Sequence, residues 1–223
     1  MKILLTGITG YIAQRLLPVL LQNGHEVVCC VRDKNRFNAQ AYPKKNLSVI
    51  EVDFLDKGSL SLIPNDIDVA YYLIHSMSTQ SGDFESMEQI CANNFKESIE
   101  KTRAAQVIYL SGIVNETELS KHLASRKKVE DILSKASFAL TTLRAGIIVG
   151  SGSASFEIIR DLVEKLPFMI TPRWVKTKCQ PIAIRNVVEF LSGVAGRPDT
   201  YHQNYDIGGP DILSYKEMLL RFA

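Results

Sequence analysis

Two glycines and an alanine near the N-terminus are the residues whose spacing most directly indicates chemistry. They form the pattern Gly7-x-x-Gly10-x-x-Ala13, between a short apolar run and a stretch with helical periodicity. Glycines at this spacing let the backbone approach a pyrophosphate, and the positive end of the following helix holds the anion. The pattern predicts a dinucleotide site, with a plain strand-to-helix connection as the alternative. The predicted site also takes in three neighbours within the turn: Thr9, Tyr11 and Ile12.

A basic residue after the second apolar run bears on which dinucleotide is bound. Arg32 follows the run 26–31. NAD-binding units usually carry an acidic residue at this point for the ribose hydroxyls, whereas an arginine favours a 2′-phosphate. The sequence therefore predicts NADP(H) as the cofactor in preference to NAD(H). Two alternatives stay open: Arg32 caps a strand in solvent, or the neighbouring Asp33 serves NAD.

Two further apolar runs, 47–52 and 68–74, end in residues suited to a cofactor site. The predicted cofactor residues at these ends are Asp53, Phe54, Leu73, Ile74 and His75. Ligands of open α/β sheets bind beyond the carboxyl ends of the strands, so we expect the second run to end beside the nicotinamide. Asp53 either meets the adenine amino group or caps the next helix. His75 has either a direct role or only a structural hydrogen bond.

The elements that must position these residues alternate between strands and amphipathic helices. Six apolar runs are expected to form strands: 3–5, 26–31, 47–52, 68–74, 107–110 and 141–149. This order predicts an α/β fold with a doubly wound parallel sheet, the Rossmann fold, and a small C-terminal lobe on the substrate side. The single domain is expected to have its core at about 1–150 and its smaller lobe at about 151–223.

The C-terminal part of the chain carries two further signals. Arg173, Lys176 and Lys178 could contact an anionic substrate, with an ordinary exposed basic edge as the alternative. Ser214-x-x-Glu217 is a capping box that begins a helix. Because the sequence ends inside that helix, a further C-terminal region is expected beyond it.

Composition limits the class of protein. The 223 residues are 46% hydrophobic, which suits one globular domain, and a formal net charge of +2 gives no support for a nucleic-acid partner. No apolar run reaches the roughly 18 residues of a transmembrane helix. The four cysteines include no C-x-x-C pair, so neither a metal site nor a disulfide framework is predicted. A cytoplasmic location is the expectation.

Five short motifs, spread over nearly the whole chain, resemble the short-chain dehydrogenase/reductase superfamily in its extended or atypical branch. They are Thr6-Gly7-x-x-Gly10-Tyr11-Ile12-Ala13, Asp53-Phe54-x-Asp56, Tyr109-Leu110-Ser111-Gly112, Leu143-Arg144-Ala145-Gly146 and Tyr205-Asp206-Ile207-Gly208-Gly209-Pro210. Within that branch the chain is similar to NAD(P)H-binding proteins related to NmrA-type regulators and to the accessory subunit of respiratory complex I. The resemblance implies an NAD(P)-binding Rossmann fold. Bacterial members of that kind often continue into a second domain.

The resemblance also implies where catalytic residues would lie. Reductases of the superfamily use a serine and a Tyr-x-x-x-Lys pair, in which the lysine lowers the pKa of the tyrosine. Ser111 matches the serine, and His122 and Arg126 fall in the tyrosine and lysine positions. None of the eight tyrosines is followed four residues later by a lysine, so the standard pair is absent.

Two functions therefore stay open. The first is an NADP(H)-dependent oxidoreductase or epimerase that acts on a small carbonyl, quinone or sugar nucleotide, a small anionic substrate included. The second is a non-catalytic module that binds NADP(H) to sense redox state, or to brace a C-terminal domain or a partner protein. The missing tyrosine–lysine pair favours the second function, whereas the intact strand ends and the separate lobe favour the first.

Overall fold

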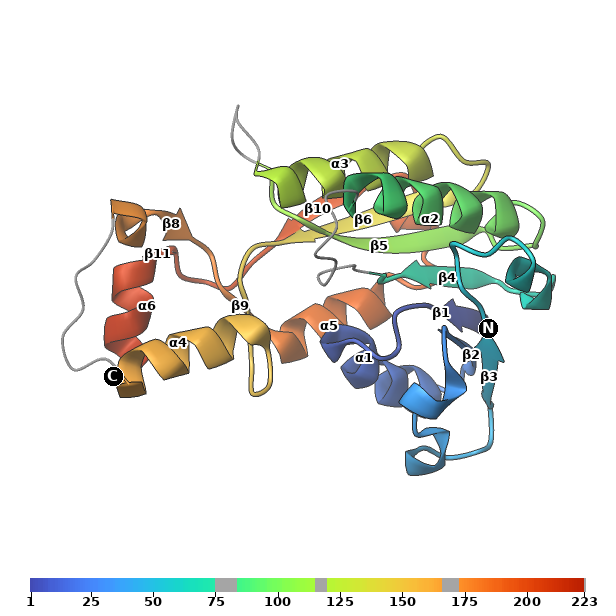
Figure 1. Ribbon diagram of the computed structural model, residues 1–223, viewed down its shortest axis with the longest axis horizontal. Helices are drawn as coiled ribbons and strands as arrows, with labels where there is room; N and C mark the ends of the chain where they lie inside the picture. The colour runs from blue at the N-terminus through green and yellow to red at the C-terminus, as the bar shows by residue number, and fades with distance from the viewer. Residues whose placement is uncertain (75–83, 115–119, 166–172, 223) are drawn as a thin grey trace.

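A parallel sheet forms the centre of the molecule. The computed structural model describes residues 1–74, 84–114, 120–165 and 173–222, and within these ranges the main sheet has seven strands in the order β10-β6-β5-β4-β1-β2-β3 (Figure 1). They are β1 (Lys2–Leu5), β2 (Glu26–Val31), β3 (Leu47–Glu51), β4 (Val69–Tyr72), β5 (Gln106–Gly112), β6 (Ala139–Ala145) and β10 (Asn204–Ile207). Neighbouring strands in this sheet run parallel. The predicted doubly wound α/β fold is confirmed.

The strand sequences explain why the sheet is parallel. β2 reads Glu-Val-Val-Cys-Cys-Val, and every residue after Glu26 is buried, as expected for a strand that is covered on both faces. β4 is buried over its whole length. Parallel neighbours need long crossover connections, and these connections carry the helices that cover the sheet.

Helices lie on both faces of the sheet. One face carries α1 (Tyr11–Gln22) and α5 (Ile184–Gly193), and the other carries α2 (Phe84–Ile99) and α3 (Lys121–Leu133) (Figure 1). α5 buries Val187, Val188 and Leu191 on the first face, and α2 buries Phe95 and Ile99 on the second. Short 3-10 segments occur at η1 (Lys34–Arg36), η2 (Ala39–Ala41), η3 (Ser59–Leu62) and η5 (Pro198–Thr200). In the described part of the chain, no helix is long and apolar enough to cross a membrane.

Strand β1 lies between β2 and β4, so the chain changes its direction of progress through the sheet at this point. Such a reversal leaves a crevice beyond the carboxyl ends of the strands, where ligands of open α/β sheets bind. Thr6 joins the two strand ends at this crevice. Its buried Oγ1 donates to the carbonyl oxygen of Tyr71 over 2.8 Å and accepts from the amide of Leu73 over 3.0 Å. The ends of β1 and β4 at the floor of the crevice are therefore held together by the Thr6 hydroxyl and by backbone groups of Tyr71 and Leu73.

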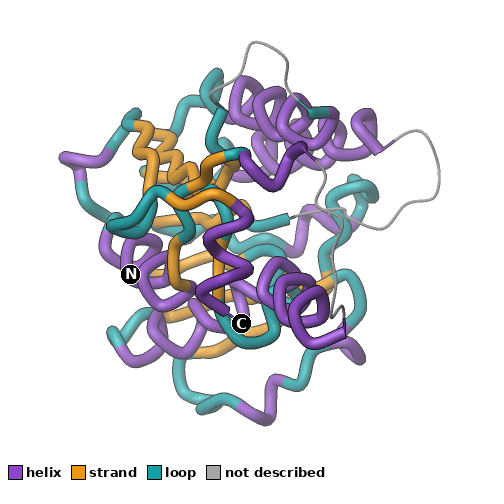
Figure 2. Tube along the Cα trace, turned by 90° about the vertical axis from the view of Figure 1, so that its left-hand side faces the viewer, coloured by secondary structure: helices purple, strands orange, loops and turns teal. Residues whose placement is uncertain are grey.

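A smaller lobe stands beside the sheet, at the left of Figure 1 and towards the viewer in Figure 2. It contains α4 (Ala154–Lys165), η4 (Arg173–Lys176), α6 (Tyr215–Phe222) and an antiparallel pair, β8 (Lys178–Cys179) with β11 (Leu213–Ser214). Its own apolar core consists of Ile159, Leu213, Met218 and Leu219. The predicted capping box is confirmed, because the amide of Ser214 donates to Glu217 and the amide of Glu217 donates to the Ser214 hydroxyl.

The division of the chain differs from the expected one, with a core to about residue 150 and a lobe after it. α5 and β10 lie beyond residue 151 but belong to the main sheet and its helices, because α5 packs on α1 and β10 pairs with β6. The expected strand 141–149 is also divided: β6 ends at Ala145, and β7 (Ile148–Val149) pairs with β9 (Ile182–Ala183) in a small separate sheet. The lobe is thus built from two separated segments of the chain.

Candidate functional site

The glycine turn between β1 and α1 is shaped by a close backbone approach. Gly7 has a φ of +68°, a conformation that favours glycine. A Cβ at this position would lie 2.7 Å from the carbonyl carbon of Leu73, and closer still to its oxygen. The amide of Gly10 donates to the carbonyl oxygen of Gly7 over 2.8 Å, which closes the turn. Any side chain on Gly7 would therefore push β1 away from the end of β4.

The N-terminus of α1 fits an anion. Gly10 is its N-cap, no side chain caps the first turn, and that turn contains no acidic residue. The first amides of a helix have no partner within the helix and carry a partial positive charge. A bare backbone turn that leads into such a helix end is the arrangement that binds a pyrophosphate. The residues present therefore fit a dinucleotide.

A cavity of about 200 Å³ lies over this turn, at the carboxyl ends of β1, β2, β3 and β4, and we call it the rim cavity. Eight of the predicted cofactor residues line it: Gly7, Thr9, Gly10, Arg32, Asp53, Phe54, Leu73 and Ile74. Seven further residues line it that the sequence did not single out: Thr6, Cys30, Val31, Val52, Leu55, Met87 and Cys91. Cys30 and Val31 lie in the buried strand β2, and Met87 and Cys91 lie in α2, where no local motif marks them. His75 falls outside the described residues.

Two predicted cofactor residues, Tyr11 and Ile12, do not line the rim cavity. The ring of Tyr11 lies under the guanidinium of Arg15, at 3.7 Å, and beside Gly150 in the segment that leads to the lobe. Arg15 Nη2 donates to the carbonyl oxygen of Ser151 over 2.7 Å. Ile12 packs against the core on the α1 face. In this structure Tyr11 packs α1 against the segment at Gly150, and Ile12 packs α1 against the core.

Asp33 and Asp53 both accept hydrogen bonds from nearby backbone amides. The carboxylate of Asp33 accepts from the amide of Asn35 over 2.9 Å and caps η1, while Arg32 is exposed at the mouth of the rim cavity. Asp53 Oδ1 accepts from the amide of Leu55 over 3.0 Å in a local turn. Asp53 also lines the rim cavity, so its turn-forming role and a role towards a ligand are compatible.

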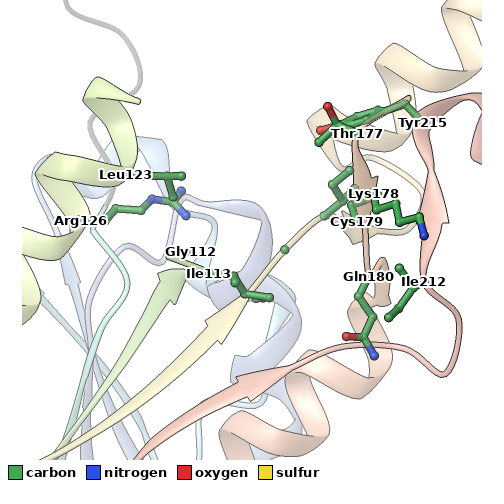
Figure 3. A pocket seen from close by; sticks show the side chains of 13 residues that line it. Gly112, Ile113, Leu123, Arg126, Thr177, Lys178, Cys179, Gln180, Ile212 and Tyr215 are labelled. Atoms are coloured by element: carbon green, nitrogen blue, oxygen red, sulfur yellow. The ribbon is translucent and has the colours of Figure 1, made fainter. Parts of the chain in front are cut away.

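A second cavity, of about 570 Å³, opens between the carboxyl ends of β5 and β6, helix α3 and the lobe, and we call it the lobe cavity (Figure 3). Its sheet side is lined by Gly112, Ile113, Leu123, Arg126, Ala145, Gly146 and Ile147, and its lobe side by Thr177, Lys178, Cys179, Gln180, Ile212 and Tyr215. Lys178 is one of the three basic residues that the sequence suggested for an anionic substrate. Lys176 is exposed and does not line the cavity, and the side chain of Arg173 is outside the described part.

Ser111 lies directly before the lobe-cavity residue Gly112. It is 1% exposed, and its Oγ has no hydrogen-bond partner in the described part of the chain. Tyr109 precedes it on the same strand and donates to the carbonyl oxygen of Arg126 over 3.2 Å. Burial raises the pKa of Tyr109, and the nearby Ser111 hydroxyl lowers that pKa by less. Ser111 is therefore a buried hydroxyl that lines neither cavity and lies one residue before the lobe cavity.

His122 and Arg126 lie one turn apart on α3, in different surroundings. α3 begins after its N-cap Ser120, which accepts from the amide of Leu123. His122 is exposed on the first turn and does not line the lobe cavity. Arg126 does line it, and its Nη1 lies 3.2 Å from the place that a Cβ on Gly112 would take. The structure thus brings Arg126 and Ser111 to the same strand end, and leaves His122 outside the cavity.

The family comparison concerns the part of the chain that carries the rim cavity. Residues 3–112 match the model of the NAD dependent epimerase/dehydratase family. The match runs from β1 to the end of β5, so it includes the glycine turn and Ser111. The resemblance to the extended short-chain dehydrogenases/reductases is confirmed and NAD(P) binding is a property of the family, whereas the narrower similarity to NmrA-type regulators and the complex I subunit stays a prediction.

Solved structures of this family type share the fold over nearly the whole chain. UDP-glucuronic acid 4-epimerase from Bacillus cereus, in complex with NAD, matches with a TM-score of 0.78 at 19% identity, over 98% of this chain and 80% of that one. Yeast methylglyoxal/isovaleraldehyde reductase Gre2, complexed with NADPH, matches with a TM-score of 0.79 at 15% identity, over 93% and 78%. One neighbour is bound to NAD and the other to NADPH, so the preference for NADP(H) stays a prediction.

Among curated proteins, the chain is similar to the chloroplastic divinyl chlorophyllide a 8-vinyl-reductase of Cucumis sativus. The two are 23% identical over 224 residues, which cover 94% of this chain and 53% of the relative. The chain therefore spans about half the length of the curated relatives it matches.

Proposed function

We propose that this protein is an NADP(H)-dependent reductase that holds the dinucleotide in the rim cavity and its substrate in the lobe cavity. The observation that supports this most directly is the contact of Gly7 with the carbonyl of Leu73, beneath a helix N-terminus that no acid neutralises. Arg32 at the mouth of the same cavity adds the cation that a 2′-phosphate requires.

Each element of the site has a distinct role in this proposal. The amides of the glycine turn and of α1 hold the pyrophosphate, and Arg32 binds the 2′-phosphate in charge-assisted hydrogen bonds. A bound nicotinamide supplies a hydride. Ser111 donates a hydrogen bond to the substrate from its buried Oγ, and the lobe shields the reacting groups from water.

Reduction is favoured over epimerisation because it needs one proton delivered once, whereas epimerisation needs a base that removes a hydroxyl proton and later returns it. The superfamily's tyrosine–lysine pair serves both reactions, as proton donor in reduction and as base in transient oxidation, so a reductase without it would take the proton that follows the hydride from Ser111 or from water. The chain has no such pair, and His122 does not line the lobe cavity. The curated relatives of this chain are vinyl-reductases, which supports a reductive reaction.

The cofactor part of the proposal is tested by calorimetric titration with NADPH and with NADH. Arg32→Ala should weaken NADPH binding by roughly tenfold to a hundredfold, since charge-assisted hydrogen bonds contribute about 1.5–3 kcal/mol, and it should leave NADH binding unchanged. Arg36→Ala is the matched control, because Arg36 is a nearby exposed cation that does not line the rim cavity. Equal losses for the two dinucleotides would contradict the assignment of Arg32, and no binding of either by the wild type would contradict the whole proposal.

A second candidate function is a non-catalytic NADP(H)-binding module, because the standard catalytic pair is absent. A panel of quinones, aldehydes and conjugated alkenes, with NADPH absorbance as the readout, separates the two. Turnover that Ser111→Ala abolishes supports the reductase. Tight NADPH binding with no oxidation by any member of the panel supports the module.

A further inference from the structure

In the part of the chain that the structure describes, the lobe cavity is lined by cations and by no acid. Among its described lining residues there are two basic side chains, Arg126 and Lys178, and no Asp or Glu. In Figure 3 Arg126 points from α3 towards Gly112, whereas the ammonium of Lys178 turns away from it, towards the lobe. Lys178 is exposed. The cation that faces the interior of the cavity is therefore Arg126.

Arg126 has no ion pair within the described residues, although acids are close by. The nearby carboxylates of α2 and α3 are engaged by other groups. Glu88 accepts from Ser125, Glu130 pairs with Arg144, and Lys128 pairs with Glu85. A partly buried cation that is left unpaired carries a desolvation cost, which a bound anion would remove.

Arg126 is partly buried, so its charge is incompletely hydrated. Burial lowers the pKa of Arg126, and the charges of Tyr109 and Glu88 offset that effect only in part. Its guanidinium nevertheless stays protonated, since arginine is effectively always charged in proteins. Its planar donors can bind a carboxylate through two parallel hydrogen bonds, which makes such a pair both strong and specific.

Much of the remaining lining offers little to a polar ligand. Apolar side chains contribute much of the surface: Ile113, Leu123, Ala145, Ile147 and Ile212. The side-chain amide of Gln180 already donates to the carbonyl oxygen of Gly209 over 2.5 Å. A sugar nucleotide presents many hydroxyls that each need a partner, whereas an apolar body needs only to be covered.

We propose that the substrate is an apolar carboxylate whose anionic group is held by Arg126 while its body fills the lobe cavity. This inference rests on the proposed function, which assigns the lobe cavity to the substrate. It narrows the substrate from the carbonyls, quinones and sugar nucleotides that the sequence allows to one chemical class. Arg126 acts here as a binding residue whose guanidinium contacts the substrate. It does not line the rim cavity, so it has no assigned role towards the cofactor.

The test compares two probes that differ only in charge at one end, 1-naphthylacetate and 1-naphthylacetamide. Calorimetry on the wild-type chain, with and without NADPH, should give at least tenfold tighter binding of the carboxylate, and weaker binding still of UDP-glucose. Arg126→Met should remove the preference for the carboxylate, and Arg126→Lys should restore part of it. Lys178→Met is the matched control, because it removes a cation from the edge of the same cavity and should retain the preference.

Several results would overturn the inference. They are equal binding of the two probes by the wild type, no binding of either at millimolar concentration, an unchanged preference in Arg126→Met, and tighter binding of UDP-glucose than of 1-naphthylacetate. The inference would also be overturned if Arg126→Met weakened NADPH binding as much as it weakened 1-naphthylacetate binding, because Arg126 would then serve the cofactor. The proposed function fails separately, if the wild type binds no dinucleotide, since the probe preference is measured without NADPH as well.

Discussion

The rim cavity and the lobe cavity lie at the carboxyl ends of one sheet, yet they are built differently. The rim cavity depends on backbone: Gly7 meets the carbonyl of Leu73, and Thr6 joins β1 to β4. The lobe cavity depends on side chains from segments that are far apart in the sequence, such as 112–113, 123–126 and 177–180. Backbone geometry suits a cofactor that many proteins share, whereas side chains can be changed to suit a substrate.

The largest expected effect is on the backbone-built site. Gly7→Ala should abolish NADPH binding and lower the free energy of unfolding by about 3 kcal/mol, because it combines a positive φ with overlap against Leu73. Gly24→Ala is the matched control, since Gly24 has a φ of +79° but no atom within 4 Å of its added Cβ. It should cost about 1 kcal/mol and leave binding intact. Chemical denaturation and calorimetry measure both quantities.

Equal losses of NADPH binding and of stability in the two alanine variants would contradict this account, because the positive φ alone would then explain the effect of Gly7→Ala. Binding of 1-naphthylacetate gives a further readout. If Gly7→Ala remains folded, it should keep this binding, since the lobe cavity does not depend on the turn.

A smaller effect is expected beneath the lobe cavity, where α3 is tied to β6. Arg144 donates to Glu130 through Nε over 3.2 Å and Nη2 over 2.5 Å, and the side chain of Glu130 is only 5% exposed. Arg144→Met should lower the free energy of unfolding by about 3 kcal/mol, because it leaves a buried carboxylate with Lys127 as its remaining partner. It should weaken 1-naphthylacetate binding through the displaced helix, and change NADPH affinity little.

Arg197→Met serves as the control for that variant. Arg197 makes a similar two-bond contact with Asp199, but both side chains are about 60% exposed, so the loss should leave unfolding almost unchanged. Loss of NADPH affinity in Arg144→Met, equal to its loss of probe affinity, would show that the two cavities are not independent.

The smallest effect is expected in the lobe. Ser214→Ala removes a helix N-cap and should lower the free energy of unfolding by about 1 kcal/mol. The Ser214 amide, and then its hydroxyl, hold the pKa of Glu217 below its ordinary value of 4.5. The carboxylate therefore adds stability above pH 4.5, and that stability is lost as the pH falls through the lowered pKa. The melting-point difference between wild type and Glu217→Gln should be present at pH 6 and should shrink towards pH 3.

Local patterns predicted the rim cavity well, because neighbouring residues build it. Gly7, Gly10 and Arg32 were chosen from their places at the ends of apolar runs, and they line the same cavity. Tyr11 and Ile12 belong to the same motif but face α5 and the loop at Gly150, because a helix turns each successive residue by about 100°. The motif identifies the turn without saying which of its side chains point inwards.

Prediction was weaker for the lobe. Nothing local in the sequence marks Thr177, Gln180 or Tyr215 as neighbours of Arg126, since no shared element carries them. The return of α5 and β10 to the sheet was also missed, because their burial depends on α1 and β6, which precede them by many residues. Long-range pairing of this kind leaves no periodic signal.

The sequence by itself determined the parallel sheet, the glycine turn and the position of a cation at the end of the second strand. These features follow from short-range chemistry: apolar runs bury on both faces, and glycine alone tolerates the turn. Only the tertiary structure decided that Arg126 has no ion pair within the described residues and faces a mostly apolar cavity. That outcome depends on which acids its neighbours engage and on where the lobe packs, and both are properties of the folded chain as a whole.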